Sequence, residues 1–135
     1  MKTVFSILLV LSCLFLQQRN AISKTHVHVV DGLASNNPPL KLHCASGDNE
    51  LGWHYPKPGD DFNFSFTPSE VVTTIFFCHF WWGAKDSAFE VYNTDGNCGK
   101  DNSQICYWLV KEDGFYFAHD HESPPASAYV KKSGW

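Results

Sequence analysis

Residues 62–66 read Phe-Asn-Phe-Ser-Phe, and this stretch decides the fold class. Successive side chains of a β-strand point to opposite faces, so the alternation places three phenylalanines on one face and two small polar residues on the other. A helix would need an apolar period of about 3.6 residues, and no stretch of the chain sustains that period over three turns. The pattern predicts a half-buried strand in an all-β protein.

Similar patterns recur along the chain between clusters of turn residues. Alternation predicts strands at residues 26–30, 40–44 and 88–92, with the inward side chains Val27, Val29, Leu40, Leu42 and Cys44. Residues 105–110 and 115–118 are predicted to pair as a hairpin around Glu112-Asp113-Gly114. Residues 71–82 are apolar at both odd and even positions (both parities), so both faces of a strand here would be apolar, which is typical of a central strand covered on both faces. We therefore predict a small antiparallel β-sandwich of about seven or eight strands, with a small closed barrel as the main alternative.

The first 23 residues have the features of a secretion signal. Lys2 gives a charged start, residues 4–16 are almost unbroken apolar residues, and Ala21-Ile22-Ser23 supplies the small residues of a cleavage site. The apolar run is shorter than the roughly 20 residues that a membrane-spanning helix needs, and no later segment approaches that length. We expect cleavage before Lys24, a secreted product without membrane insertion, and one domain over residues 24–135 with an irregular tail from about residue 119.

The predicted mature chain is acidic. The first 23 residues hold two basic residues and no acidic ones, so residues 24–135 carry eight Lys and Arg against 14 Asp and Glu. Nucleic acids and anionic lipid surfaces attract basic proteins, and both are disfavoured as partners. An acidic wall polymer is disfavoured for the same reason.

Four cysteines remain after the signal, because Cys13 lies within it: Cys44, Cys78, Cys98 and Cys106. An even number in a short exported chain predicts two disulfides, and four cysteines allow three pairings. No two are separated by the two to four residues that a zinc site uses. We expect no cofactor and no bound metal. His119-Asp120-His121, and His26 with His28, are weak metal-site alternatives that lack a third ligand.

Several sequence motifs occur in an order that resembles that of one protein family. Val27-His28-Val29-Val30 is followed by the stretch from Leu40 to Ser46, by the stretch from Asp48 to His54, by Phe76-Phe77-Cys78-His79-Phe80-Trp81-Trp82 and by Cys106-Tyr107-Trp108. Together they are similar to the plant self-incompatibility S1 family, over residues 27 to about 117. The chain departs from the usual pattern at Glu50, where aspartate is common, and in its longer C-terminal stretch.

The resemblance implies a secreted β-sandwich in which Cys44 is joined to Cys78 and Cys98 to Cys106. The founding members are pistil proteins of poppy that act as ligands for a pollen receptor. We therefore expect a non-enzymatic ligand in extracellular recognition. Its partner would be a plasma-membrane receptor or another extracellular protein, and the chain would be a monomer.

Recognition by such a ligand would belong to its loops, since the strand faces build the core. The candidate partner-binding residues come from three loops: Lys57, Asp60 and Asp61; Lys85 and Asp86; Lys100 and Asp101. Asn63-Phe64-Ser65 is an N-glycosylation sequon, and strand parity places Asn63 on the outer face.

Two other functional classes compete with the ligand. A cell-wall carbohydrate-binding or defence protein would stack sugar rings on exposed aromatics, for which the candidates are Trp53, Trp81, Trp82 and Trp135. A flat row of exposed aromatics favours that class, whereas buried aromatics with charged loops outermost favour the ligand. A hydrolase would need a catalytic set, and the sequence has no Gly-x-Ser-x-Gly elbow and no cysteine left unpaired as a nucleophile.

Overall fold

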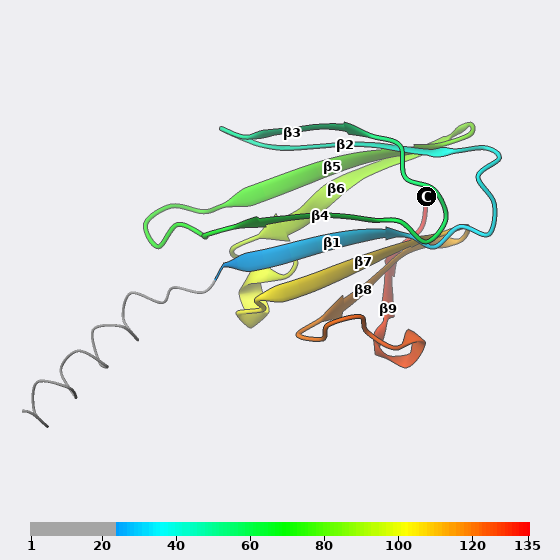
Figure 1. Cartoon of the computed structure of the whole chain (residues 1–135). Helices are drawn as coiled ribbons and strands as arrows, with labels where there is room; N and C mark the ends of the chain where they lie inside the picture. Colours follow the sequence, from blue (N-terminus) through cyan, green and yellow to red (C-terminus); the bar gives the residue numbers. More distant parts are fainter. Residues whose placement is uncertain (1–23) are drawn as a thin grey trace, which may run out of the picture.

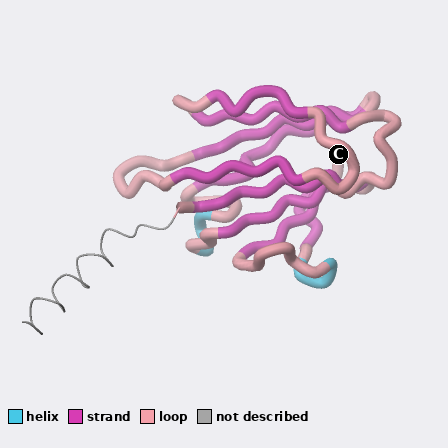
Figure 2. The backbone as a smooth tube through the Cα atoms, in the orientation of Figure 1, coloured by secondary structure: helices cyan, strands magenta, loops and turns pink. Residues whose placement is uncertain are grey.

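The computed structural model of the chain describes residues 24–135, and the predicted signal with Cys13 lies outside the described residues. In this described part of the chain, nine strands form two facing sheets (Figure 1). Sheet A has the order β4 (Asp61–Phe66), β1 (Thr25–Asp31), β7 (Ile105–Lys111), β8 (Gly114–His119) and β9 (Val130–Ser133). Sheet B has the order β3 (Glu50–His54), β2 (Leu40–Ser46), β5 (Ile75–Trp82) and β6 (Lys85–Asn93). Two short 3₁₀ helices, η1 (Gly99–Asp101) and η2 (Ala126–Ala128), lie in connecting segments (Figure 2).

The predicted β-sandwich is confirmed, with two corrections. Residues 24–135 form nine strands instead of seven or eight, because β3 and β9 were not recognised as strands. One strand pair is parallel: β1 runs alongside β7, from His26 opposite Ile105 to Asp31 opposite Val110. The first strand of the domain therefore lies inside sheet A, between β4 and β7.

Alternating side chains of both sheets fill the space between them. The residues predicted to point inward on β1 and β2 are buried: Val27, Val29, Leu40, Leu42 and Cys44. Phe62, Phe64 and Phe66 of β4 are half-buried against this core, and their successive ring centroids are 5.9 and 6.0 Å apart. Asn63 lies between them on the exposed side of an edge strand, so its glycosylation stays a prediction that the geometry permits.

A β-bulge in β6 of sheet B is hydrogen-bonded to a side chain of sheet A. Phe76 of β5 pairs with Tyr92 and Phe77 with Glu90, which leaves Val91 without a partner on β5. The Val91 carbonyl accepts a hydrogen bond of 3.0 Å from the indole Nε1 of Trp108, a buried side chain of β7 in sheet A. The indole therefore satisfies a buried carbonyl that the bulge removes from regular pairing, and it joins the two sheets.

The prediction that residues 71–82 form one strand covered on both faces was wrong. The strand begins at Ile75, and Val71 and Val72 lie exposed in the loop before it. Only one parity of β5 is buried, with Phe76, Cys78 and Phe80 in the core. The other parity faces solvent, where Phe77 is 47% exposed.

The tail after residue 119 is not irregular throughout. β9 pairs with β8, with Lys131 opposite Tyr116 and Val130 opposite Phe117. The last residue is also anchored, because the indole Nε1 of Trp135 donates to the Lys111 carbonyl at 2.8 Å and its ring centroid lies 4.7 Å from that of Phe115. The end of the chain is therefore part of the folded domain.

Two disulfides join the cysteines in the pairing that the family resemblance implied. Cys44 of β2 and Cys78 of β5 are directly opposite each other, with Cα atoms 4.1 Å apart. Cys98 and Cys106 enclose η1, with Cα atoms 6.1 Å apart. The first bridge lies within sheet B, and the second fixes a loop at one end of the sandwich.

Candidate functional site

The predicted partner-binding residues lie at opposite ends of the sandwich. Lys100 and Asp101 belong to η1, beside the start of β1; we call this the η1 end (Figure 1). Lys57 and Asp60 lie in the loop before β4, at the end of the sandwich where β1 finishes; we call this the opposite end. The structure therefore does not bring the predicted residues together into one surface.

Three of the predicted loop residues are strand residues. Asp61 opens β4, and Lys85 and Asp86 open β6. Two of the acids also have intramolecular partners, since Asp61 Oδ2 lies 2.7 Å from His28 Nδ1 and Asp86 Oδ2 lies 2.9 Å from His79 Nε2. These contacts reduce the number of groups that the opposite end offers to a partner.

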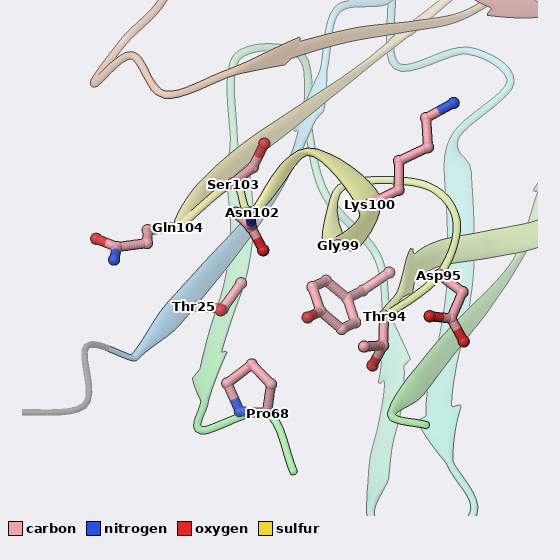
Figure 3. Close-up of a pocket in the computed structure, with 10 residues that line it drawn as sticks. Thr25, Pro68, Thr94, Asp95, Gly99, Lys100, Asn102, Ser103 and Gln104 are labelled. Atoms are coloured by element: carbon pink, nitrogen blue, oxygen red, sulfur yellow. The ribbon is translucent and has the colours of Figure 1, made fainter. Parts of the chain in front are cut away.

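The η1 end has a hollow of about 610 Å³ (Figure 3). It is lined mainly by hydroxyl and amide side chains, with one acid and one base: Thr25, Tyr92, Thr94, Asp95, Lys100, Asn102, Ser103 and Gln104. Figure 3 shows Lys100 and Asp95 on one flank of the hollow and Gln104 on the other. The lining offers hydrogen-bond donors and acceptors to a polar partner, with a charged group of each sign.

The loop that forms one wall of this hollow is held by hydrogen bonds to the end of β6 and by its disulfide. Asn97 Nδ2 donates to the Glu90 carbonyl at 2.9 Å, and Asn93 N–H donates to the Asn97 carbonyl at 3.0 Å. Cys98 and Asn102 flank η1 with φ values of 72° and 54°, in the left-handed region that ordinary residues rarely adopt. The disulfide from Cys98 to β7 closes this loop, so its shape is fixed before any partner arrives.

Burial differs between the floor and the rim of the hollow. Thr25, Tyr92 and Ser103 are buried, whereas Lys100 and Asp95 are exposed. Burial raises the pKa of the Tyr92 phenol, and a hydrogen bond with Thr94 opposes that rise. The phenol is therefore neutral at ordinary pH and serves as a hydrogen-bonding group.

Ser103 and His119 form a contact that the sequence did not reveal. His119 Nδ1 lies 3.0 Å from Ser103 Oγ and 2.9 Å from Asp120 Oδ2. In Ser-His-Asp catalysis the hydroxyl and the carboxylate bind opposite nitrogens of the imidazole, so that one orients the ring while the other transfers its proton. Both groups contact the same nitrogen here, and this arrangement does not activate a serine nucleophile.

The histidines considered as metal ligands are not assembled into a site. Within residues 24–135, no group of three or more His, Cys, Asp or Glu side chains is placed to hold a metal ion. In the same described range, no helix has the length and apolar character needed to cross a membrane.

Asp31, at the opposite end, is a buried carboxyl group with one unpaired oxygen. Its side chain accepts the Leu33 N–H through Oδ1 at 3.0 Å, whereas Oδ2 has no hydrogen-bond partner among the residues that the structure describes. Burial raises the pKa of this carboxyl above its ordinary value, the Leu33 hydrogen bond opposes the rise, and the charges of Asp60 and Glu112 add to it. The folded chain therefore binds a proton at Asp31 more tightly than the unfolded chain does.

We expect Asp31→Asn to stabilise the protein at neutral pH by about 1 kcal/mol, because it removes an ionised group with an unpaired buried oxygen. For an acid whose pKa is raised on folding, the stabilising contribution is complete below the unfolded pKa and is lost as pH rises through the folded pKa. The advantage of Asp31→Asn should therefore grow with pH. Urea unfolding at pH 3 and pH 7 measures it. Asp101→Asn, at an exposed position, is the matched control. An equal gain at both pH values would contradict the assignment.

Comparison with known proteins identifies the fold and the family. The sequence profile of the family described as plant self-incompatibility protein S1 matches residues 26–130. The chain belongs to this family. It is 38% identical to S-protein homolog 9 of Arabidopsis thaliana over 120 residues, which cover 83% of this chain and 85% of that protein. It is 33% identical to S-protein homolog 11 of the same plant over 129 residues, or 89% of this chain and 86% of the relative.

A solved structure has the same fold. It belongs to the self-incompatibility protein homologues, described as a widespread family of small, highly stable, secreted proteins from plants. The TM-score is 0.56 at 19% sequence identity, and the match covers 77% of this chain and 91% of the solved chain. The S1-type sandwich of this chain is therefore supported by both its sequence and its structure.

Proposed function

We propose that this S1 family protein is secreted and acts, without catalysis, as an extracellular recognition ligand. Its partner is the outer domain of a plasma-membrane receptor or another extracellular protein. The hollow at the η1 end makes the contact, and the protein acts as a monomer. Membership of a self-incompatibility family and the predicted signal at residues 1–23 support this proposal.

The single observation that carries the proposal is the fixed polar wall of the hollow. A loop that is ordered before contact loses little conformational entropy on binding, so more of the interaction energy appears as affinity. η1 is ordered by its enclosing disulfide and by the hydrogen bonds of Asn93 and Asn97. The polar lining of the hollow is typical of the rim of a protein–protein interface and is unsuited to an apolar small molecule.

The contact at Ser103 argues for binding over chemistry. Ser103 is 4% exposed and shares His119 Nδ1 with Asp120, so it has neither the access nor the base that a nucleophile requires. The acidic balance of residues 24–135 favours long-range attraction of a partner with a basic face, but net charge does not determine which groups meet at the contact, where Lys100 would pair with an acidic group of the partner.

The experiment is proximity labelling with the folded mature protein on intact pollen and vegetative cells. We expect enrichment of a membrane protein, and we expect Lys100→Glu to reduce its labelling about tenfold, because the change reverses a charge at the rim of the contact. Lys57→Glu makes the same charge change in the loop at the opposite end and should have little effect. Absence of any enriched membrane protein would overturn the proposal. A loss with Lys57→Glu alone would overturn the placement at the η1 end.

A further inference from the structure

The outer face of sheet B carries a row of aromatic side chains that the core does not use. The row consists of His43 on β2, Trp53 on β3, and His79 and Trp81 on β5, with Lys41 of β2 among them; we call it the sheet B aromatic row. Trp53 is 51% exposed and lies on the edge strand β3, which within residues 24–135 pairs with β2 alone. Its ring centroid lies 5.1 Å from that of Trp81, which is stacked on His79 at 3.7 Å.

Polar groups flank these rings on both sides. His43 Nε2 lies 2.6 Å from Glu50 Oε1, and His79 Nε2 lies 2.9 Å from Asp86 Oδ2. Lys41 Nζ lies 5.0 Å from the centroid of each tryptophan ring, and no ion pair involving Lys41 is found within residues 24–135. Its ammonium group is thus held over the rings with hydrogen-bond donors available to a bound molecule.

The other sheet provides an internal comparison. Sheet A also has a stacked pair on its outer face, His28 with Tyr107, whose ring centroids are 4.1 Å apart. The chain itself covers that pair: Tyr107 is buried, and its hydroxyl accepts the Ser123 N–H from the segment that follows β8. No such segment crosses the outer face of sheet B in the described part of the chain (Figure 1). The fold therefore covers one aromatic pair and leaves the other open.

We propose that the sheet B aromatic row binds a neutral, β-1,4-linked glycan chain. Such a sugar presents an apolar C–H face for stacking on an aromatic ring and equatorial hydroxyls around its edge for hydrogen bonds. The row matches both properties: Trp53 is the exposed ring for stacking, Trp81 supports it from the side while stacked on His79, and Lys41 and the two histidine–carboxylate pairs form the polar edge. Together with Asp86 on β6, the row crosses the four strands of sheet B, or roughly 14 Å, the length of a short oligosaccharide.

Charge distinguishes this ligand from two alternatives. Lys41 is the only fixed cation of the row, and Glu50 and Asp86 lie on its two sides, so a polyanion would meet more negative charge than positive. A second copy docked around a two-fold axis through the row would bring Lys41 against Lys41 of its partner, at a cost in like-charge repulsion. A neutral polymer meets neither obstacle.

Two of the four tryptophans considered for sugar stacking are not available. Trp82 and Trp135 pack against the core, and their ring centroids are 5.6 Å apart. Only Trp53 and Trp81 lie on the open face. The glycan site goes beyond the proposed receptor contact, because it uses a strand face between the two ends and leaves the η1 end free.

The test is calorimetric and fluorescence titration of the disulfide-intact mature protein with cellohexaose, with maltohexaose and polygalacturonate as comparison ligands. We expect binding of cellohexaose. Trp53→Ala should weaken it about tenfold, and the Trp53→Ala/Trp81→Ala double variant should abolish it. Tyr116→Ala is the matched control, because Tyr116 is a half-buried aromatic residue on the outer face of sheet A. Like the tryptophans of the row, its ring has a lysine nearby, with Lys111 Nζ 5.3 Å from the ring centroid.

Three outcomes would overturn this site: no binding of cellohexaose, binding that the double variant retains, or an equal loss with Tyr116→Ala. Preferred binding of polygalacturonate would overturn the neutral class. Thermal unfolding of each variant verifies that it is folded. Membrane-protein labelling by the Trp53→Ala/Trp81→Ala variant should equal that of the unmodified protein, so failure of the glycan site and failure of the proposed receptor contact give different results.

Discussion

Removing the bridge between Cys44 and Cys78 by a double alanine substitution is expected to lower the free energy of unfolding by about 4 kcal/mol. The bridge closes a loop of 34 residues in the unfolded chain, and its loss increases the entropy of that state. Both cysteines are completely buried in sheet B, so their removal also weakens packing between β2 and β5. Urea unfolding followed by circular dichroism measures the loss.

The second bridge is the internal control for this prediction. Cys98 and Cys106 are separated by only eight residues, and the same entropy relation predicts a loss of about 2.5 kcal/mol for their double alanine variant. Loss of the Cys98–Cys106 bridge should change the shape of the η1 loop more than it changes the free energy of unfolding, because this bridge fixes the wall of the hollow at the η1 end. Equal losses from the two double variants would show that loop length does not determine their contributions.

Trp108→Ala is expected to destabilise the protein by about 4 kcal/mol, because it empties the space of a large buried side chain. The Trp108 ring lies between those of Phe89 and Phe117, with both centroid distances at 4.8 Å. The substitution also leaves the Val91 carbonyl of the bulge without its hydrogen bond, which adds to the cost. Chemical denaturation gives the magnitude.

Trp108→Phe separates packing from hydrogen bonding. It keeps an aromatic ring but removes the indole N–H, so we expect a loss of about 2 kcal/mol. Trp53→Ala, at an exposed position on sheet B, should change stability by less than about 1 kcal/mol. If Trp108→Phe were as stable as the unmodified protein, the bulge carbonyl would not depend on this contact.

The strands with simple alternation were predictable because their pattern is local. Residues 62–66 and 40–44 show one apolar face each, and both form strands with that face inward. The stretch at 71–82 was misassigned because apolar residues on its outer parity indicate burial, whereas Phe77 and Trp81 instead form part of an open aromatic face. β9 was missed because Val130-Lys131-Lys132-Ser133 has no alternating apolar pattern, and all four residues are exposed.

The site was less predictable, because it depends on which distant segments the topology brings together. The disulfide loop was identified from Cys98 and Cys106, and Lys100 lines the hollow. Thr25 and Ser103 were not identified, since their neighbourhood arises from the parallel pairing of β1 with β7, which no local pattern indicates. The hydrogen bonds of Asn93 and Asn97 that order the loop were not identified either, because they lie at the end of β6, where no local pattern indicates the bulge.

The position of β1 between β4 and β7 also constrains when the chain can fold. A ribosome or an export channel releases β1 first, yet one of its two neighbours in the sheet belongs to the last third of the sequence. Contacts this distant form slowly, because the intervening chain must close before they contribute. Sheet A thus cannot be completed during synthesis until β7 has emerged, whereas all four strands of sheet B precede β7 in the chain.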